Sequence, residues 1–168
     1  HIAFIMDGNG RWGKKRNKSR NYGHLKGVEI VKKIVAKSIK LKIPVISFYV
    51  FSSENWKRPK NEISYLFTLI KNYFLNEIDR VTSQGIKINI LGELNKLSPN
   101  LKRILLKTSH LTKKNNKITV NLAINYGSKF ELISTFKKTK GKLNIKNFEK
   151  NLYAKLQPFP DILVRAIR

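Results

Sequence analysis

The residues best suited to chemistry lie at the start of the sequence, where Asp7 is followed by Gly8, Asn9, Gly10 and Arg11. Glycines let a backbone approach a ligand closely and turn its N–H groups toward an anion. A carboxylate at a strand end can hold Mg²⁺, while arginine and backbone N–H groups hold phosphate oxygens. Because Asp7 alone would repel a phosphate, these residue types fit together with a metal between them. Taken alone, the glycine spacing favours an ordinary tight turn after a strand.

A second polar block, residues 51–59 (FSSENWKRP), shifts the balance toward a binding site. It follows the apolar run 45–51, as the first block follows the apolar run 2–6. In open parallel α/β sheets, ligands bind beyond the carboxyl ends of the strands, so the two blocks are expected to face one cleft. The blocks contain no Ser-His-Asp or Cys-His arrangement, and the glycine loop lacks the GK[ST] ending of a nucleotide-binding P-loop. This set of residues predicts a site for diphosphate and metal.

The elements that must position these blocks alternate between strands and helices. Short apolar runs predict strands over residues 2–6, 45–51, 87–92, 118–125 and 160–165. Helical patterns and caps predict helices over residues 25–40, 62–83, 98–112 and 128–138, and a short helix capped by Asn147 that runs to Leu156. The alternation indicates an α/β fold, a single-domain open, mostly parallel sheet with helices on both faces.

The polar, basic stretch 13–23 is expected to be a loop, with Arg20 and His24 at its end. His24 would then lie at the N-terminal end of the following helix, where N–H groups and the helix dipole favour an anion. An exposed helix cap is an equal alternative for His24. The long helix over residues 62–83 carries one apolar stripe, which is expected to be mostly core, and Gly85 is well placed to end it.

The composition limits the class of protein. With 168 residues, 41% of them hydrophobic, the chain is expected to form one globular domain, residues 1–168. It has no cysteine, which excludes disulfides, a thiolate nucleophile and cysteine-ligated zinc. No apolar run approaches the roughly 20 residues that span a bilayer, and no secretory signal is visible. A cytoplasmic location is therefore expected, and the abrupt start on a strand suggests that N-terminal residues are missing.

The formal net charge of +25 is the strongest feature of the composition. The favoured interpretation is a lysine-rich codon bias spread over solvated surfaces, because lysine greatly outnumbers arginine and the lysines are scattered. Attraction to anionic membrane surfaces or diphosphate substrates comes second. Nucleic-acid binding comes last, although basic surfaces do gain affinity by releasing phosphate counterions.

Four motifs together resemble a known family: HIAFIMDGNGRW at residues 1–12, YGH at 22–24, FSSENWKRP at 51–59 and NYG at 125–127. The sequence resembles the cis-prenyltransferases, or isoprenyl transferases, of the bacterial undecaprenyl diphosphate synthase type. The motifs occur in the family's order, and the resemblance runs from His1 to Arg165. The implied fold includes a hydrophobic tunnel, for which Phe67 and Phe74 of the long helix are candidate wall residues.

The resemblance implies a role for each motif residue. Asp7 would be the Mg²⁺ ligand and an essential acid, and Asn55 would correspond to the assigned proton acceptor, although an amide is a poor base. The implied substrate-binding residues are Gly8, Asn9, Gly10, Arg11, Trp12, Arg20, His24, Ser52, Ser53, Glu54, Trp56, Arg58 and Arg165.

The implied reaction adds isopentenyl diphosphate units to an allylic diphosphate, typically farnesyl diphosphate, with cis double bonds, and gives a polyprenyl diphosphate. The implied cofactor is Mg²⁺. The implied assembly is a homodimer with peripheral contact at the inner face of the membrane for product release, and with no nucleic acid partner. The family's domain continues beyond Arg165 with a glycine-containing turn, a further arginine and serine, and a glutamate that completes the metal site. We therefore expect that the C-terminal part of the family domain is missing from this sequence.

Two other functions stay open. A non-catalytic accessory relative is one, but such relatives tend to lose the aspartate of the first motif, and Asp7 is present. A basic nucleic-acid-binding module is the other. Its aromatic residues would be interleaved with a lysine patch, whereas here they lie in the motifs and the apolar stripes.

Overall fold

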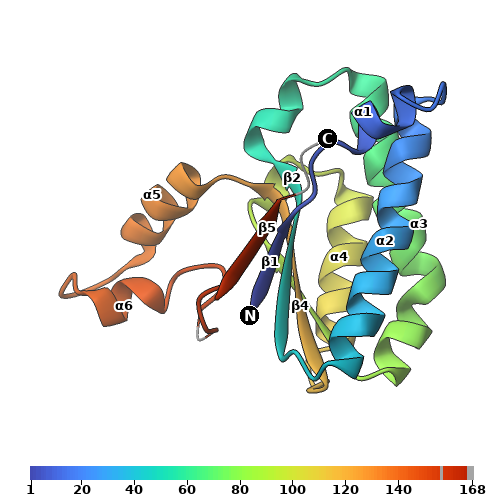
Figure 1. Cartoon of the computed structure of the whole chain (residues 1–168). Helices are drawn as coiled ribbons and strands as arrows, with labels where there is room; N and C mark the ends of the chain where they lie inside the picture. Colours follow the sequence, from blue (N-terminus) through green and yellow to red (C-terminus); the bar gives the residue numbers. More distant parts are fainter. Residues whose placement is uncertain (156, 166–168) are drawn as a thin grey trace.

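The protein is built on a five-stranded sheet with the strand order β3-β4-β2-β1-β5, in which every pair of neighbours is parallel. It is described from a computed structural model that covers residues 1–155 and 157–165 (Figure 1). The strands are β1 (Ile2–Ile5), β2 (Val45–Ser52), β3 (Ile86–Leu91), β4 (Ile118–Tyr126) and β5 (Ile162–Arg165). Since all strands run the same way, their carboxyl ends meet at one edge of the sheet.

The helices lie on both sides of this sheet, so the predicted α/β fold is confirmed (Figure 1). One layer contains α2 (Arg20–Lys40), α3 (Lys60–Ser83) and α4 (Pro99–Leu111), while α5 (Ser128–Lys138) and α6 (Ile145–Glu149) project from the other side. Short helical segments α1 (Asn9–Lys14) and η1 (Ser53–Lys57) follow β1 and β2, and η2 (Leu94–Lys96) follows β3.

The hydrophobic core lies between the sheet and the three-helix layer. Phe48 and Ile46 of β2, Ile124 of β4 and Leu105 of α4 are fully buried there. The Phe48 ring stacks on Phe4 of β1 with 5.2 Å between the ring centroids. Burying such a side chain stabilises the fold by about 1.5–3 kcal/mol, so this layer fixes β1 and β2 beside each other.

Two predicted helix boundaries are confirmed in detail. The Ser98 hydroxyl accepts a hydrogen bond from the N–H of Leu101 at 3.4 Å, and Pro99 is the first residue of α4. Gly85 follows the C-cap of α3 with φ 71°, the left-handed conformation that glycine adopts without strain.

The prediction of a loop over residues 13–23 is confirmed only for residues 15–19 and was wrong at both ends. Helix α1 occupies residues 9–14, and α2 begins at Arg20, capped by the Ser19 hydroxyl. Two glycines that suggested a loop instead let the helices approach: a Cβ on Gly13 would lie 2.4 Å from Ser19 O, and one on Gly23 would lie 1.9 Å from Asn9 O. His24 is therefore not at the helix terminus but one turn inside α2, and it is buried.

Two smaller predictions also need correction. The short apolar run 2–6 is typical of a strand buried on both faces, but β1 is only half-buried along its length. Helix α6 is capped by Asn144, whose side chain accepts from the N–H of Asn147 at 2.9 Å, so Asn147 lies inside the helix. The helix ends at Glu149, and Leu156 lies outside the described residues.

None of the helices described is both long and apolar enough to cross a membrane.

Candidate active site

A basic cradle lies just beyond the carboxyl end of β1. It is a cavity of about 220 Å³ lined by Met6, Asp7, Gly8, Asn9, Gly10, Arg11, Arg20, His24 and Arg58. Gly8 takes φ 86°, which turns the chain from β1 directly into α1 and brings Arg11 back toward Asp7. The structure thus gathers the predicted glycine loop, three of the predicted arginines and His24 around one hollow.

An apolar cavity of about 280 Å³ extends from the same place between α2, α3 and the sheet. It shares Asp7, Asn9, His24 and Arg58 with the basic cradle. Its other lining residues are largely apolar. They are Val28 and Val31 of α2, Leu66, Ile70, Tyr73 and Phe74 of α3, Ile5, Tyr49, Val50, Leu122 and Ile124 of the sheet and Met6, together with the polar Ser52, Asn55 and Arg165. One continuous site is therefore charged at its mouth and apolar along its length.

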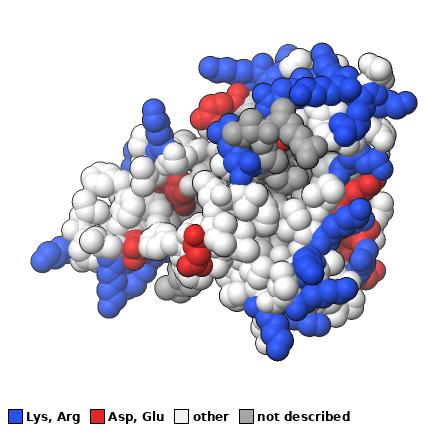
Figure 2. Space-filling model, in the orientation of Figure 1, with Lys and Arg blue, Asp and Glu red and all other residues white. Residues whose placement is uncertain are grey.

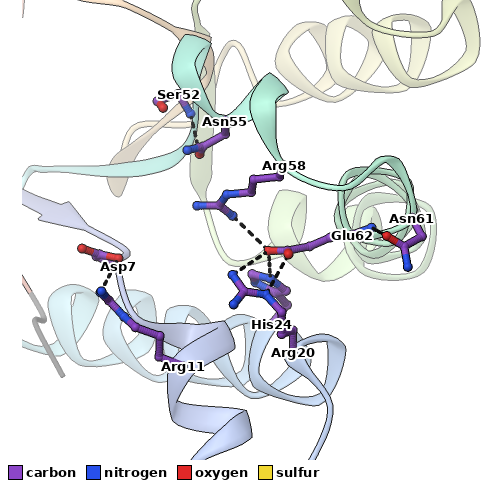
Figure 3. Close-up of polar contacts among 9 residues, drawn as sticks. All are labelled: Asp7, Arg11, Arg20, His24, Ser52, Asn55, Arg58, Asn61 and Glu62. Atoms are coloured by element: carbon purple, nitrogen blue, oxygen red, sulfur yellow. Dashed lines mark hydrogen bonds and ion pairs between the residues drawn. The ribbon is translucent and has the colours of Figure 1, made fainter.

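Glu62, at the start of α3, joins three of the basic side chains (Figure 3). Its Oε2 accepts from Arg20 Nε at 2.7 Å, and its Oε1 lies 3.0 Å from His24 Nε2 and 3.4 Å from Arg58 Nη1. Glu62 is buried, but the Arg20 and Arg58 side chains are partly exposed, so water screens these ion pairs in part. This carboxylate holds cationic groups from α2 and from the residue after η1 around the cradle.

Glu62 was not among the residues predicted for the site. The sequence did contain a signal: an acidic residue stands beside Ile63 on the otherwise apolar stripe of α3, four residues after Arg58. Burial raises the pKa of Glu62, but the hydrogen bonds from Arg20 and His24 outweigh it and leave this pKa below its usual value. Glu62 therefore stays charged at neutral pH.

His24 is neutral at pH 7. Burial lowers its pKa, and although the hydrogen bond to Glu62 acts in the opposite direction, the charges of Arg58 and Arg20 add to the lowering. The neutral ring donates through Nε2 to Glu62. His24 therefore adds no positive charge to the cradle, and its position is fixed by the carboxylate.

Asp7 faces two arginines that come from opposite ends of the sequence. Its Oδ1 accepts from Arg11 Nη2 at 3.0 Å, and its Oδ2 accepts from Arg165 Nη2 at 3.2 Å. Partial burial raises the pKa of Asp7, but the bonds from Arg165 and the Gly8 N–H and the charge of Arg11 leave it lower than usual. Arg165 reaches Asp7 because β5 pairs with β1 in register, with Arg165 beside Ile5.

The second motif forms the η1 turn at the carboxyl end of β2. The Asn55 Oδ1 accepts from the Ser52 N–H at 3.1 Å, and the Ser52 side chain accepts in return from the Asn55 backbone (Figure 3). Ser52 and Asn55 both line the apolar cavity near its mouth, together with Arg58. Ser53 and Glu54 are exposed and bonded to each other, with 3.1 Å between Ser53 Oγ and Glu54 Oε1.

Of the bulky aromatic side chains considered for the site, some pack against other protein side chains and one lines the apolar cavity. Trp12 packs between Tyr22 and Arg16, with the Arg16 guanidinium 4.1 Å from the centre of its ring. Trp56 and Phe67 pack on each other and on Phe51, with 4.9 Å between the rings of Phe67 and Phe51. These contacts belong to the core, whereas Phe74 does line the apolar cavity.

The residues of the cradle fit a metal that is shared with a ligand. Within residues 1–155 and 157–165, no group of three or more acidic or histidine side chains could hold a metal ion alone. Mg²⁺, however, usually takes one or two carboxylates together with substrate phosphates and water. Asp7 supplies one carboxylate beside an anion cradle, which is the donor set that this mode requires.

The sequence was compared with known proteins, and residues 5–167 match the family model described as "Putative undecaprenyl diphosphate synthase". The chain belongs to this family. The predicted membership of the isoprenyl transferases, an enzyme family, is confirmed.

Individual relatives agree with the family match. An isoprenyl transferase of Clostridium perfringens is 38% identical over an alignment of 175 positions, which covers 98% of this chain and 69% of the relative. The ditrans,polycis-undecaprenyl-diphosphate synthase ((2E,6E)-farnesyl-diphosphate specific) of Haemophilus influenzae is 37% identical, with 98% and 73% covered. The crystal structure of lavandulyl diphosphate synthase from Lavandula x intermedia, in complex with dimethylallyl diphosphate, superposes with a TM-score of 0.91 at 25% identity, covering 98% of this chain and 76% of that one.

Proposed function

We propose that the protein adds isopentenyl diphosphate units to an allylic diphosphate, such as farnesyl diphosphate, and forms a cis double bond at each step. The observation that carries this proposal is the union of the basic cradle and the apolar cavity through shared residues. A substrate with a charged diphosphate head and a hydrocarbon tail matches both parts. The polyprenyl diphosphate product would grow along the apolar cavity between α2 and α3.

The arginines would stabilise the charge that develops as the allylic carbon–oxygen bond breaks. The electron pair of that bond goes to the leaving diphosphate, which would lie in the cradle lined by Arg11, Arg20 and Arg58 from three segments of the chain. Donors that are already in place where charge appears lower the barrier without reorganising in the reaction. Glu62 contributes by holding Arg20 and Arg58 in position before substrate binds.

The double bond of isopentenyl diphosphate then attacks the allylic carbon, and loss of a proton completes the new unit. Arg165, which donates to Asp7, would hold the diphosphate of this second substrate. Asn55 is proposed to orient the reacting groups rather than to act as a strong base, because its amide oxygen already accepts the Ser52 N–H. The released diphosphate, retained by the arginines, can take the proton.

Mg²⁺ is the proposed cofactor, and Asp7 would hold it. When bound, it would neutralise part of the diphosphate charge and polarise the breaking bond.

Ser52 and the glycine loop, residues 8–10, would contact the diphosphate oxygens, and the exposed pair Ser53 and Glu54 would flank the entrance. Trp12 and Trp56 are proposed to support the loops rather than to contact the prenyl chain, because both pack against protein side chains.

Two further partners are part of this proposal. A homodimer would cover the apolar side chains that α5 and β5 expose, among them Phe136 and Leu163.

A peripheral contact with an anionic membrane would use the lysines and arginines that follow the glycine loop, where residues 11–20 hold six basic and no acidic residues. Figure 2 shows Lys and Arg side chains along the edge of the molecule where α1 lies.

The test is a transfer assay with radiolabelled isopentenyl diphosphate, with and without Mg²⁺. With farnesyl diphosphate as primer, we expect products that are several units longer and that carry cis double bonds by NMR. Chelation with EDTA should abolish them. A protein that binds the two diphosphates but forms no product with any allylic primer would instead fit the accessory relative.

The net charge of +25 is the one observation that favours a nucleic-acid-binding module. If the charge is mainly lysine bias, generic duplex DNA should bind weakly, with an affinity that falls steeply with salt. Submicromolar duplex binding that persists at about 200 mM salt would favour the second function, because nonspecific contacts weaken greatly there.

A further inference from the structure

Asn125 has an unusual backbone for a buried strand residue. It lies near the end of β4, its exposed fraction is 4%, and its φ is 51°, in the left-handed region that most residues avoid. The pairing of β2 with β4 shifts register at the same level, around Phe51 and Ser52. Such a conformation persists only where the surrounding contacts hold it in place.

The side-chain amide of Asn125 is satisfied in both directions. Its Nδ2 donates to the carbonyl oxygen of Glu93 at 2.6 Å, and its Oδ1 accepts from the indole Nε1 of Trp56 at 2.8 Å. The backbone carbonyl of Asn125 also accepts from the N–H of Glu93 at 3.2 Å. Asn125 thus ties the connection after β3 to the η1 turn after β2.

Trp56 carries this constraint to the mouth of the cavity. An indole can only donate, so a half-buried Nε1–H needs the acceptor that Asn125 supplies. The adjacent Asn55 and the residue Ser52 are locked to each other and line the apolar cavity. Holding the indole therefore fixes the rotation of the whole turn relative to the cradle.

The next glycine supports the same turn. A Cβ on Gly127 would lie 2.5 Å from the Ser53 hydroxyl oxygen, so the end of β4 presses directly against the η1 turn. The segment 125–127 therefore contacts the second motif at two separate points, the Trp56 indole and the Ser53 hydroxyl.

We propose that Asn125 is a positioning residue: by holding the Trp56 indole, it sets where Ser52 and Asn55 lie at the mouth of the cavity. This proposal rests on the proposed function, because it assumes that the turn contacts substrate. Asn125 itself acts only through Trp56. Its left-handed backbone is the conformation that lets one amide reach Glu93 and Trp56 at the same time.

The main variant is Asn125→Gly, since glycine adopts φ 51° without strain and the change removes the side chain that carries the amide. Asn125→Asp keeps an acceptor for the indole but loses the donor to Glu93. The matched control is Asn121→Ala, which removes another buried amide from β4, one that bonds Ser47 and Gln157 instead of the η1 turn.

The first readout is the indole N–H signals of the two tryptophans in a ¹H–¹⁵N spectrum, assigned with Trp56→Phe. In Asn125→Gly the Trp56 signal should move upfield and exchange faster with water, while Asn125→Asp keeps most of the hydrogen-bonded shift. Asn121→Ala should leave both signals in place. An unchanged Trp56 signal in Asn125→Gly overturns the proposal.

The second readout is kcat/KM for the allylic diphosphate, at a temperature where every variant is folded. A misplacement of about 1 Å can cost on the order of 10²-fold, so Asn125→Gly should lose roughly 10–100-fold, with partial rescue in Asn125→Asp. Lost stability with unchanged kcat/KM would show a structural role only and overturns the proposal. If the wild-type protein transfers no prenyl group, the proposed function fails. The positioning role is then tested by the backbone amide signals of Ser52 and Asn55 in the ¹H–¹⁵N spectrum. Displaced signals in Asn125→Gly support this role, and unchanged signals overturn it.

Discussion

The Nε2 atom of His24 lies 3.0 Å from Oε1 of Glu62, and both side chains are buried between α2 and α3. The same carboxylate also pairs with Arg20 and Arg58, so one buried acid organises the basic half of the cradle before any ligand is present. Because His24 is neutral, the charge of this group is set by one carboxylate and two guanidinium groups. Glu62 therefore links the stability of the fold to the arrangement of the arginines that are proposed to hold diphosphate.

Replacing Glu62 with glutamine should lower the free energy of unfolding by about 2–3 kcal/mol, because charged hydrogen bonds to Arg20 and His24 are lost in a buried place. Urea unfolding measures this change. Glu29→Gln is the control, since Glu29 pairs with Lys26 on the exposed face of α2 and such pairs contribute about 0–1 kcal/mol. Equal losses in the two variants would contradict the proposed role of Glu62.

Stability should fall as the pH is lowered below about 6.5, the usual pKa of a histidine side chain. The folded-state pKa of His24 is lower than its value in the unfolded chain, about 6.5. As the pH falls, the unfolded chain therefore binds a proton at a higher pH than the folded protein does, and acid stabilises the unfolded state relative to the folded state. The contribution is fully present above pH 6.5 and is lost as the pH falls. The Glu62 carboxylate adds its own loss only below about pH 4.5.

Thermal unfolding at several pH values, compared between wild type and His24→Gln, checks this prediction. Glutamine cannot titrate, and it keeps a neutral donor toward Glu62. His1 and His110 are present in both proteins, so the difference in slope reports His24 alone. Parallel pH profiles for the two proteins would show that His24 titrates as it does in the unfolded chain.

Asp7→Ala should reduce turnover by about 10²–10³-fold, the scale of losing one principal electrostatic group, while the melting temperature changes little. Little stability is lost because Arg11 and Arg165 are both more than half exposed and remain hydrated. Asp161→Asn is the control. Asp161 is exposed just before the start of β5, and its replacement should leave turnover unchanged. Near wild-type turnover of Asp7→Ala with Mg²⁺ would remove Asp7 from the mechanism.

Phe74→Ala should lengthen the product, because Phe74 lines the apolar cavity and its truncation makes space for further units. Phe67→Ala is the matched control, since Phe67 packs on Phe51 and Trp56 in the core. Both changes should cost about 3–5 kcal/mol of stability. Product lengths are compared by chromatography at a temperature where both variants are folded. If both variants make products of wild-type length, the length limit lies elsewhere.

Phe136→Asp should shift the protein from dimer to monomer in analytical ultracentrifugation. Phe136 on α5 is 59% exposed among other apolar side chains, so a charge there would oppose burial in a subunit contact. Ile30→Asp is the control, because Ile30 on α2 is also half exposed but lies in the opposite layer. A wild-type protein that is monomeric at micromolar concentration would contradict the proposed dimer.

Local sequence was sufficient for most of the fold. Apolar runs and helical spacing identified the five strands and the main helices, and the positions of the two motifs at strand ends predicted one shared cleft. The loop predicted over residues 13–23 is limited to residues 15–19, because Gly13 and Gly23 belong to two closely packed helices rather than to a turn. Such a role depends on a partner helix that the local sequence does not show.

The site contacts that the sequence did not predict also depend on tertiary structure, because they join residues that are far apart in the chain. The bond between Glu62 and His24 joins residues 38 positions apart, and that between Trp56 and Asn125 joins residues 69 apart. Neither pair follows from helix or strand spacing. The prediction of the α6 cap failed for a different reason. Asn144 and Asn147 are three residues apart, and asparagine at either position is a residue type that can cap a helix.

The pairing of β1 with β5 also sets an order of events during synthesis. Arg165 is made 158 residues after Asp7, which at about 5–20 residues per second is roughly 8–30 s later. Throughout that interval β1 lacks the neighbour on one edge, and the acid has only Arg11 beside it. A nascent chain can therefore form its helix layer early, whereas the contact between Arg165 and Asp7 forms late. Premature termination before β5 would spare much of the core and would remove this second arginine from Asp7.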